Sequence, residues 1–213
     1  MAEPELPQIY LITPPEPDFA TFPDQLAPVL DAAPVACIRI ASALESADAD
    51  RLGRAADVIR EIAHARDIPV LIETHLMLVE RHGLDGVHLP DGARSVRRAR
   101  KALGREAIIG AFCGASRHDG MTAGEAGADY IAFGPVGETG LGEARRAERA
   151  LFEWWSEMIE LPVVAEGGLS EALVRDLAPV ADFFAFGPEI WSAENPAARL
   201  ATFAETIRAS AAG

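Results

Sequence analysis

Short apolar runs alternate with longer amphipathic stretches along this sequence, and the alternation limits the possible folds more than any other feature. Most of the runs are rich in Val, Ile and Phe without a strict two-residue alternation, which is typical of parallel strands buried on both faces. We expect eight strands, at residues 9–13, 35–40, 70–74, 86–89, 107–112, 130–134, 163–166 and 183–187.

The stretches between the runs have helical patterns. Residues 50–65 repeat apolar side chains at helical spacing, a serine suited to an N-cap opens residues 95–103, and a proline opens residues 196–211. Further helices are expected at residues 148–159 and 170–177. Eight strands that alternate with helices fit either a closed parallel barrel or a doubly wound sheet.

An internal repeat favours the barrel. Residues 83–89, 127–133 and 180–186 each end a helical stretch and place an aspartate just before a strand. No Gly-x-Gly-x-x-Gly follows the first strand, so a dinucleotide-binding sheet loses its best support. We therefore predict an α/β protein with a single (β/α)8 TIM barrel over residues 1–213, a length that suits one core better than two.

Charge and composition exclude several classes of partner. The formal net charge of −14 argues against nucleic acid and against an anionic membrane surface. Cys37 and Cys113 are far apart and imply no disulfide framework, and we find neither a signal peptide nor an apolar run long enough to span a bilayer. We expect a cytoplasmic protein, and a homodimer is compatible with the sequence. Trp154, Trp155 or Trp191 could mark its interface, although core or surface packing explains these tryptophans equally well.

Glycines follow the last two predicted strands, where the binding site of a barrel lies. Gly167 and Gly168 come after the seventh strand and Gly187 after the eighth. Amides without a neighbouring Cβ can approach an anion closely, and barrels often bind phosphate at these two loops. The sequence therefore predicts a phosphate site here. Residues 133–143 form another glycine-rich loop, which either closes over a ligand or is a simple connection.

Four segments occur in an order that resembles a known superfamily. They are Tyr-Leu-Ile-Thr at 10–13, Asp-Gly-Val-His-Leu at 85–89, Gly-Ala-Asp-Tyr-Ile-Ala-Phe-Gly-Pro at 127–135 and Val-Val-Ala-Glu-Gly-Gly at 163–168. The chain resembles the thiamine phosphate synthase and thiazole tautomerase superfamily over essentially its whole length. The resemblance implies a TIM barrel. For the synthase it implies that a pyrimidine pyrophosphate is joined to a thiazole phosphate, with Mg²⁺ and release of pyrophosphate.

The chain departs from the superfamily's motifs at five strand ends. Gln-x-Arg-x-Lys becomes Cys-Ile-Arg-Ile-Ala at 37–41, and the Asn-Asp pair becomes Glu-Thr at 73–74. The motif His-Leu-Gly-Gln-x-Asp becomes His-Leu-Pro-Asp-Gly-Ala at 88–93, Ser-x-His becomes Cys-Gly-Ala-Ser at 113–116, and Thr-x-Thr-Lys becomes Thr-Gly-Leu-Gly at 139–142. Both Mg²⁺ carboxylates and both lysines implied by the resemblance are therefore missing.

These losses bear on the chemistry. Pyrophosphate leaves with its negative charge, which only nearby cations can stabilise. Lys101 is the single lysine and belongs to a predicted helix, and Pro188 stands where the superfamily has a serine. The tautomerase's histidine is missing too, although His118 follows a few residues later. The resemblance implies Mg²⁺ as a cofactor, but its carboxylate ligands are not retained.

A ring of functional side chains remains at the predicted strand ends. Our catalytic candidates are Arg39, Glu73, His88, Cys113, Thr139 and Glu166, with His75 beside them. The two glutamates and a histidine could hold a divalent metal, or a glutamate whose pKa is raised by burial could act as a general base. We favour a third interpretation, in which Arg39 pairs with a glutamate and His88 is a hydrogen-bonded core histidine, and we assign no metal site.

Three functions are compatible with this sequence. The first is a thiamine phosphate synthase-like enzyme, the second a diverged barrel enzyme for another phosphorylated substrate, and the third a non-catalytic protein that binds a thiamine precursor. The resemblance supports the first, and the missing cations and carboxylates favour the other two. We expect a thiamine phosphate synthase-like protein by descent, with a phosphorylated small molecule as its ligand.

Overall fold

The computed structural model describes residues 6–18, 21–41, 49–138 and 145–210, and these form one closed barrel of eight parallel strands. Each strand pairs with the next along the chain, and β8 closes the ring by pairing with β1. The strands are β1 Gln8–Ile12, β2 Val35–Ile40, β3 Val70–Glu73, β4 Gly86–Leu89, β5 Ile108–Phe112, β6 Tyr130–Phe133, β7 Val163–Glu166 and β8 Phe183–Phe186. The predicted (β/α)8 barrel is confirmed, and all eight strands lie where we expected them.

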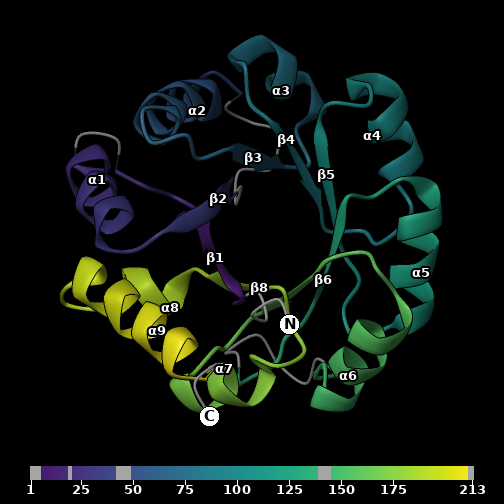
Figure 1. Cartoon of the computed structure of the whole chain (residues 1–213). Helices are drawn as coiled ribbons and strands as arrows, with labels where there is room; N and C mark the ends of the chain where they lie inside the picture. The colour runs from purple at the N-terminus through teal and green to yellow at the C-terminus, as the bar shows by residue number, and fades with distance from the viewer. Residues whose placement is uncertain (1–5, 19–20, 42–48, 139–144, 211–213) are drawn as a thin grey trace.

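Helices surround the barrel as an outer ring (Figure 1). They are α1 Phe22–Ala32, α2 Ala49–His64, α3 Leu76–His82, α4 Val96–Leu103, α5 Arg117–Ala126, α6 Arg149–Met158, α7 Glu171–Leu177, α8 Pro188–Trp191 and α9 Pro196–Ser210. The short helix α8 follows β8 directly, and α9 then packs against both α1 and α7. One strand–helix unit therefore follows another around the ring.

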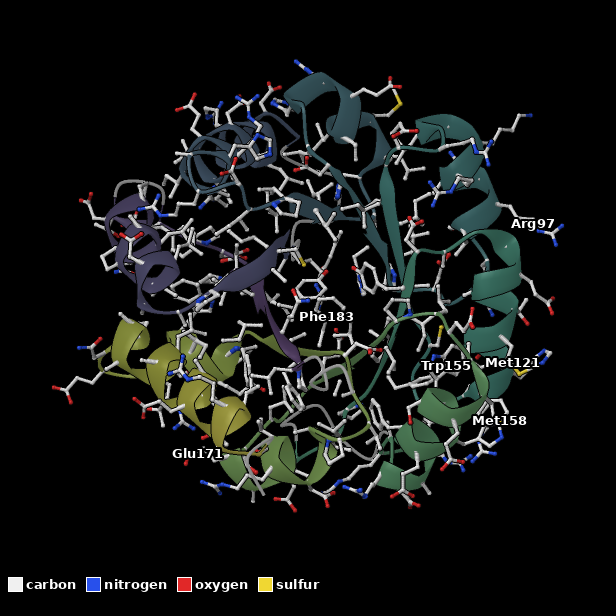
Figure 2. The ribbon with its side chains drawn as sticks, in the orientation of Figure 1. Arg97, Met121, Trp155, Met158, Glu171 and Phe183 are labelled. Carbon is white, nitrogen blue, oxygen red and sulfur yellow. The ribbon has the colours of Figure 1, made fainter. Side chains whose placement is uncertain are left out.

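Apolar side chains form two separate cores. The larger core lies between the strands and the helices, and the smaller one lines the inside of the barrel, with Tyr10, Leu71, Tyr130 and Val164 among its members. Figure 2 shows Phe183 within the ring of strands. These side chains surround a cavity of about 250 Å³ at the amino-terminal end of the barrel interior. The carboxyl ends of the strands are left for polar groups.

The repeated aspartates have a structural reason. Asp85, Asp129 and Asp182 each precede an even-numbered strand and accept a hydrogen bond from a backbone N–H of the preceding odd-numbered strand. Each of the three N–H···O distances is 2.7 Å. These bonds lie at the amino-terminal end of the barrel, which serves stability, whereas active sites lie at the opposite end. The repeat in the sequence thus reflects three equivalent strand pairs.

Three helices have no clear signal in the sequence. Helix α1 contains Pro28, α3 has only seven residues, and α5 carries Gly120 and Gly124, which lower its helix propensity. Gly120 lies against Trp155 so closely that a Cβ there would be 2.8 Å from the indole ring. Packing of α5 on α6 therefore outweighs the unfavourable local sequence.

The tryptophans are held by the barrel's own structure. Trp155 is buried, Trp191 donates its indole N–H to the carbonyl of Ile12 at 2.6 Å, and Trp154 carries the guanidinium of Arg117 over its ring. The homodimer stays a prediction.

Among the helices that the structure describes, we find none with the length and apolar character needed to cross a bilayer.

Candidate functional site

Four predicted residues meet at the carboxyl-terminal mouth of the barrel. Arg39, Glu73, His88 and Glu166 belong to β2, β3, β4 and β7, and the register pairs Glu73 directly with His88. Their side chains point into the barrel because residues alternate along each strand between its interior and its helix-covered face. The closed sheet thus brings together residues that are up to 127 positions apart in the sequence.

Arg39 connects two carboxylates across the mouth. Its Nη1 donates a hydrogen bond to Oε2 of Glu166 at 2.9 Å, and its Nε lies 3.1 Å from Oε1 of Glu73, although at an angle that makes no hydrogen bond. Burial opposes the charge of this guanidinium, which is 5% exposed, but the carboxylates of Glu166 and Glu73 outweigh burial and raise the pKa of Arg39 above its ordinary value. The pairing of Arg39 with a glutamate, expected from the sequence, is present.

A chain of hydrogen bonds runs below this ion pair. The hydroxyl of Tyr130 lies 2.7 Å from the hydroxyl of Tyr10 and 2.9 Å from Nδ1 of His88. Gly110 makes room for it, since a Cβ at that position would lie 1.9 Å from the Tyr130 ring. Burial raises the pKa of both tyrosines, and burial together with the charge of Arg39 holds the pKa of His88 well below its usual value. His88 is therefore a neutral, hydrogen-bonded core histidine.

Sequence reasoning missed both members of the tyrosine pair. Tyr10 and Tyr130 are the only tyrosines in the chain, and both occupy predicted strands. A buried tyrosine usually requires a hydrogen-bond partner, so these two residue types in strand positions were the available signal.

The remaining catalytic candidates are not part of this cluster. Cys113 packs in the core between strands and helices, and its thiol donates to the carbonyl of Ala111. Burial, with a smaller effect of Asp119, raises the pKa of Cys113 to about 12. His75 begins α3, where its Nδ1 contacts the Glu73 carbonyl at 2.8 Å. His118 is exposed on α5, and Thr139 lies outside the described residues.

At the predicted phosphate site, the backbone N–H groups of Gly168, Leu169 and Gly187 converge on one point, which we call the anion cradle. A side chain of the protein already occupies it. Glu189 accepts hydrogen bonds from the N–H groups of Gly168 and Leu169 at Oε1, at 2.9 and 3.1 Å. Its Oε2 accepts from the N–H of Gly187 at 2.9 Å. The amides of two predicted glycines thus converge on one carboxylate. Sequence reasoning missed Glu189 as that carboxylate, and phosphate binding at these glycines stays a prediction.

The loop after β6 is fastened to this cradle. Val136 and Gly137 donate their N–H groups to the carbonyl of Gly167 at 3.0 and 2.9 Å. Gly168 has a φ of +73°, and a Cβ there would lie 2.7 Å from the carbonyl oxygen of Glu138. Both the positive φ and the close backbone contact require glycine. The rest of the loop that we considered as a cover, residues 139–143, lies outside the described residues.

The donor groups at the mouth do not fit the Mg²⁺ implied by the superfamily. Glu73 and Glu166 both direct a carboxylate oxygen at Arg39. Across the described ranges, no group of three His, Cys, Asp or Glu side chains is arranged to hold a metal ion. Mg²⁺ prefers several oxygen ligands in octahedral geometry, which a pair of carboxylates neutralised by a guanidinium does not offer. We derive no chemical step through this ion.

Comparison with known proteins places the chain in a family. The sequence profile of thiamine monophosphate synthase matches residues 9–189. The thiamine-phosphate synthase of Rhodospirillum centenum is 39% identical over 94% of this chain and 98% of its own length, and that of Erythrobacter litoralis is 38% identical over 99% and 100%.

A solved structure agrees with the barrel. A thiamine phosphate pyrophosphorylase from Pyrococcus furiosus matches with a TM-score of 0.82 at 20% identity, covering 95% of this chain and 96% of that one. At this identity the match supports the fold alone. Taken with the full-length relatives, the mouth of the barrel and its glycine loops belong to a thiamine phosphate synthase-like protein, and the chain is a member of the thiamine monophosphate synthase family.

Proposed function

We propose that this chain binds a thiamine precursor at the mouth of its barrel and does not carry out the Mg²⁺-dependent release of pyrophosphate. The observation that carries the proposal is the engagement of Arg39 by Glu73 and Glu166. This guanidinium is the one cation of the superfamily's strand-two motif that the chain keeps, and its charge is neutralised by the protein itself.

The electrostatics oppose a pyrophosphate group. Arg39, Glu73 and Glu166 together carry a formal charge of −1, and Glu189 adds a further negative charge at the same end of the barrel. Removal of one well-placed stabilising group from an active site costs roughly 10²–10³ in kcat. A mouth that lacks both lysines and both metal carboxylates loses several such groups at once, so turnover at the rate of a synthase is not expected.

The same groups suit the organic part of a thiamine precursor. The carboxylates of Glu73 and Glu166 can accept hydrogen bonds from a ligand, and the side chains are only partly exposed, at 23% and 14%. An aminopyrimidine offers N–H donors, and the thiazolium ring of thiamine, formed when the two precursors are joined, carries a positive charge. Both features complement a mouth that combines hydrogen-bond acceptors with net negative charge.

The synthase reaction itself is the second candidate. It is favoured by the near-complete alignment with two thiamine-phosphate synthases at 38–39% identity. The two candidates differ in a simple way, because only the second requires Mg²⁺ and yields pyrophosphate.

Calorimetric titration separates the candidates. The probes are the thiazole phosphate, the corresponding thiazole alcohol, the pyrimidine pyrophosphate and thiamine, each with and without Mg²⁺. We expect at least one thiazole or thiamine probe to bind with an affinity that Mg²⁺ does not change. Absence of binding by all four probes, or an absolute requirement for Mg²⁺, would contradict the proposal.

A pair of matched variants locates the binding. Glu73→Gln removes a negative charge at the mouth, whereas Glu157→Gln removes one from the exposed outer surface of α6. We expect the first variant to weaken binding of thiamine and the second to leave it unchanged. Equal effects of the two variants would show that only overall charge matters.

A further inference from the structure

Glu189 is held in the anion cradle by three donors from two loops. Oε1 receives the N–H groups of Gly168 and Leu169 after β7, and Oε2 receives that of Gly187 after β8. Hydrogen bonds from neutral N–H groups to a carboxylate are charge-assisted and roughly twice as strong as those between neutral groups. The carboxylate is therefore bound in the manner expected of an anionic ligand.

The backbone around Glu189 is fixed on both sides. Pro188 restricts the backbone just before it, and Ile190 is buried just after it. Trp191 then donates its indole N–H to the carbonyl of Ile12 at 2.6 Å and packs against the ring of Phe22 at 5.1 Å. Because these neighbours are anchored, the Glu189 side chain reaches the cradle with little loss of conformational freedom on binding there.

A phosphate ester has to displace this carboxylate before it can use the same amides. A group tethered at short range competes at an effective concentration on the order of millimolar or higher. The cradle cannot widen to accept both anions, since Gly168 already lies against the backbone of Gly137 and Glu138. A displaced Glu189 would also remain close to a dianionic phosphate and repel it.

Counting the described residues alone, the bound carboxylate still has a free acceptor position. A carboxylate offers about four lone-pair sites, and the N–H groups of Gly168, Leu169 and Gly187 use three of them. Oε2 accepts one N–H and Oε1 accepts two, so the open site is on Oε2. A hydroxyl group can donate to that site, whereas a phosphate dianion has no proton to donate.

We propose that Glu189 takes the place of a ligand phosphate, so that this site selects a ligand bearing a free hydroxyl over the corresponding phosphate ester. The inference rests on the proposed function and makes it more specific, since the preferred thiazole is the alcohol. Glu189 is a specificity-determining residue at the cradle, and the protein supplies by a side chain the negative charge that a phosphorylated ligand would bring.

The test compares three ligands and three proteins. The ligands are the thiazole alcohol, the thiazole phosphate and inorganic phosphate, and the proteins are the natural chain, Glu189→Ala and Glu194→Ala. Glu194 is an exposed acidic residue soon after α8, so its variant removes the same charge without opening the cradle. Circular dichroism and thermal unfolding confirm that each protein is folded before titration.

We expect the natural chain and Glu194→Ala to bind the thiazole alcohol about tenfold or more tightly than the thiazole phosphate. Calorimetry readily resolves a difference of this size. Glu189→Ala should reverse that order and also gain affinity for inorganic phosphate. In NMR spectra of the ¹⁵N-labelled proteins, inorganic phosphate should shift the amide resonances of Gly168, Leu169 and Gly187 in Glu189→Ala alone.

The outcomes distinguish the two proposals. Tighter binding of the thiazole phosphate than of the alcohol by the natural chain would overturn this inference and leave the proposed function standing. No gain in phosphate affinity in Glu189→Ala would also overturn it. If no thiazole or thiamine probe binds while Glu189→Ala gains inorganic phosphate, the proposed function and the hydroxyl preference fail, and only the place of Glu189 in the cradle survives.

Discussion

The guanidinium of Arg39 on β2 reaches across the barrel and donates a hydrogen bond to Glu166 on β7, with a separation of 2.9 Å between Nη1 and Oε2. The two strands are not neighbours in the sheet, so the contact spans the mouth rather than running along its wall. An arginine that a pyrophosphate-releasing enzyme would direct at its substrate is here paired with the protein's own carboxylates.

Breaking this ion pair should destabilise the fold. Arg39→Gln leaves Glu73 and Glu166 without their shared cation, and removal of one partner of a buried pair typically costs about 3–5 kcal/mol. We expect the lower part of that range, because both carboxylates retain some contact with water. Urea unfolding measures the loss, and a change below about 0.5 kcal/mol, as for an ordinary surface substitution, would contradict it.

The hydroxyl groups of Tyr10 and Tyr130 should contribute different amounts to the free energy of unfolding. Tyr130 is the middle member of the chain, so Tyr130→Phe leaves both Tyr10 and His88 without the hydrogen bond they share with it. Tyr10→Phe removes only one end and leaves the bond between Tyr130 and His88. Since each buried group left unpaired costs about 1–3 kcal/mol, Tyr130→Phe should be the more destabilising variant. Equal free energies of unfolding for the two variants would argue against the proposed chain of hydrogen bonds from Tyr10 through Tyr130 to His88.

The buried His88 should make stability depend on pH. Its pKa is depressed in the folded protein, so below the ordinary value of about 6.5 the unfolded chain binds a proton that the folded chain does not. Stability should therefore be full above that pH and fall as the pH drops below it, by up to about 1.4 kcal/mol per pH unit for this one group.

Urea unfolding at several pH values between about 5.5 and 7.5 checks this behaviour, in a window above the ordinary carboxylate range. His88→Gln should flatten the profile, whereas His118→Gln, at an exposed position on α5, should keep it. A profile that stays equally steep without His88 would assign the dependence to other groups.

Neither cysteine should behave as a nucleophile. Burial raises the pKa of Cys37 and of Cys113 to about 12, and the thiolate is the reactive form. At about pH 8, a thiol reagent should label Cys37 and Cys113 slowly in the folded protein. In denaturant, the same reagent should label both cysteines rapidly. Rapid labelling of Cys113 in the native protein would restore it as a catalytic candidate.

The strands could be predicted because their signal is local. Apart from Arg39 and Glu166 near their carboxyl ends, runs such as Val35–Ile40 and Val163–Glu166 are apolar on both faces, and the structure begins and ends them at the expected residues. Helix α5 could not be predicted, since its two glycines are explained by distant side chains: a Cβ at Gly120 would lie 2.8 Å from Trp155, and one at Gly124 would lie 3.0 Å from Leu161. Local composition identifies what a segment buries but not the partner against which it packs.

The site was predictable to the same limited extent. Strand-end positions identified Arg39, Glu73, His88 and Glu166, because a parallel barrel gathers such positions at one end. The glycines predicted an anion cradle, but nothing in the residues after Gly187 indicated that Glu189 folds back onto the amides. Cys113 is one residue beyond β5, and its turn away from the mouth depends on the local backbone path.

Release of pyrophosphate is the measurement that tests the account most directly. The chain is incubated with the pyrimidine pyrophosphate, the thiazole phosphate and Mg²⁺, and the thiamine-phosphate synthase of Rhodospirillum centenum serves as the control protein. We predict pyrophosphate release by the control and none above background by this chain. Mg²⁺-dependent release by this chain at any rate above background would contradict the account.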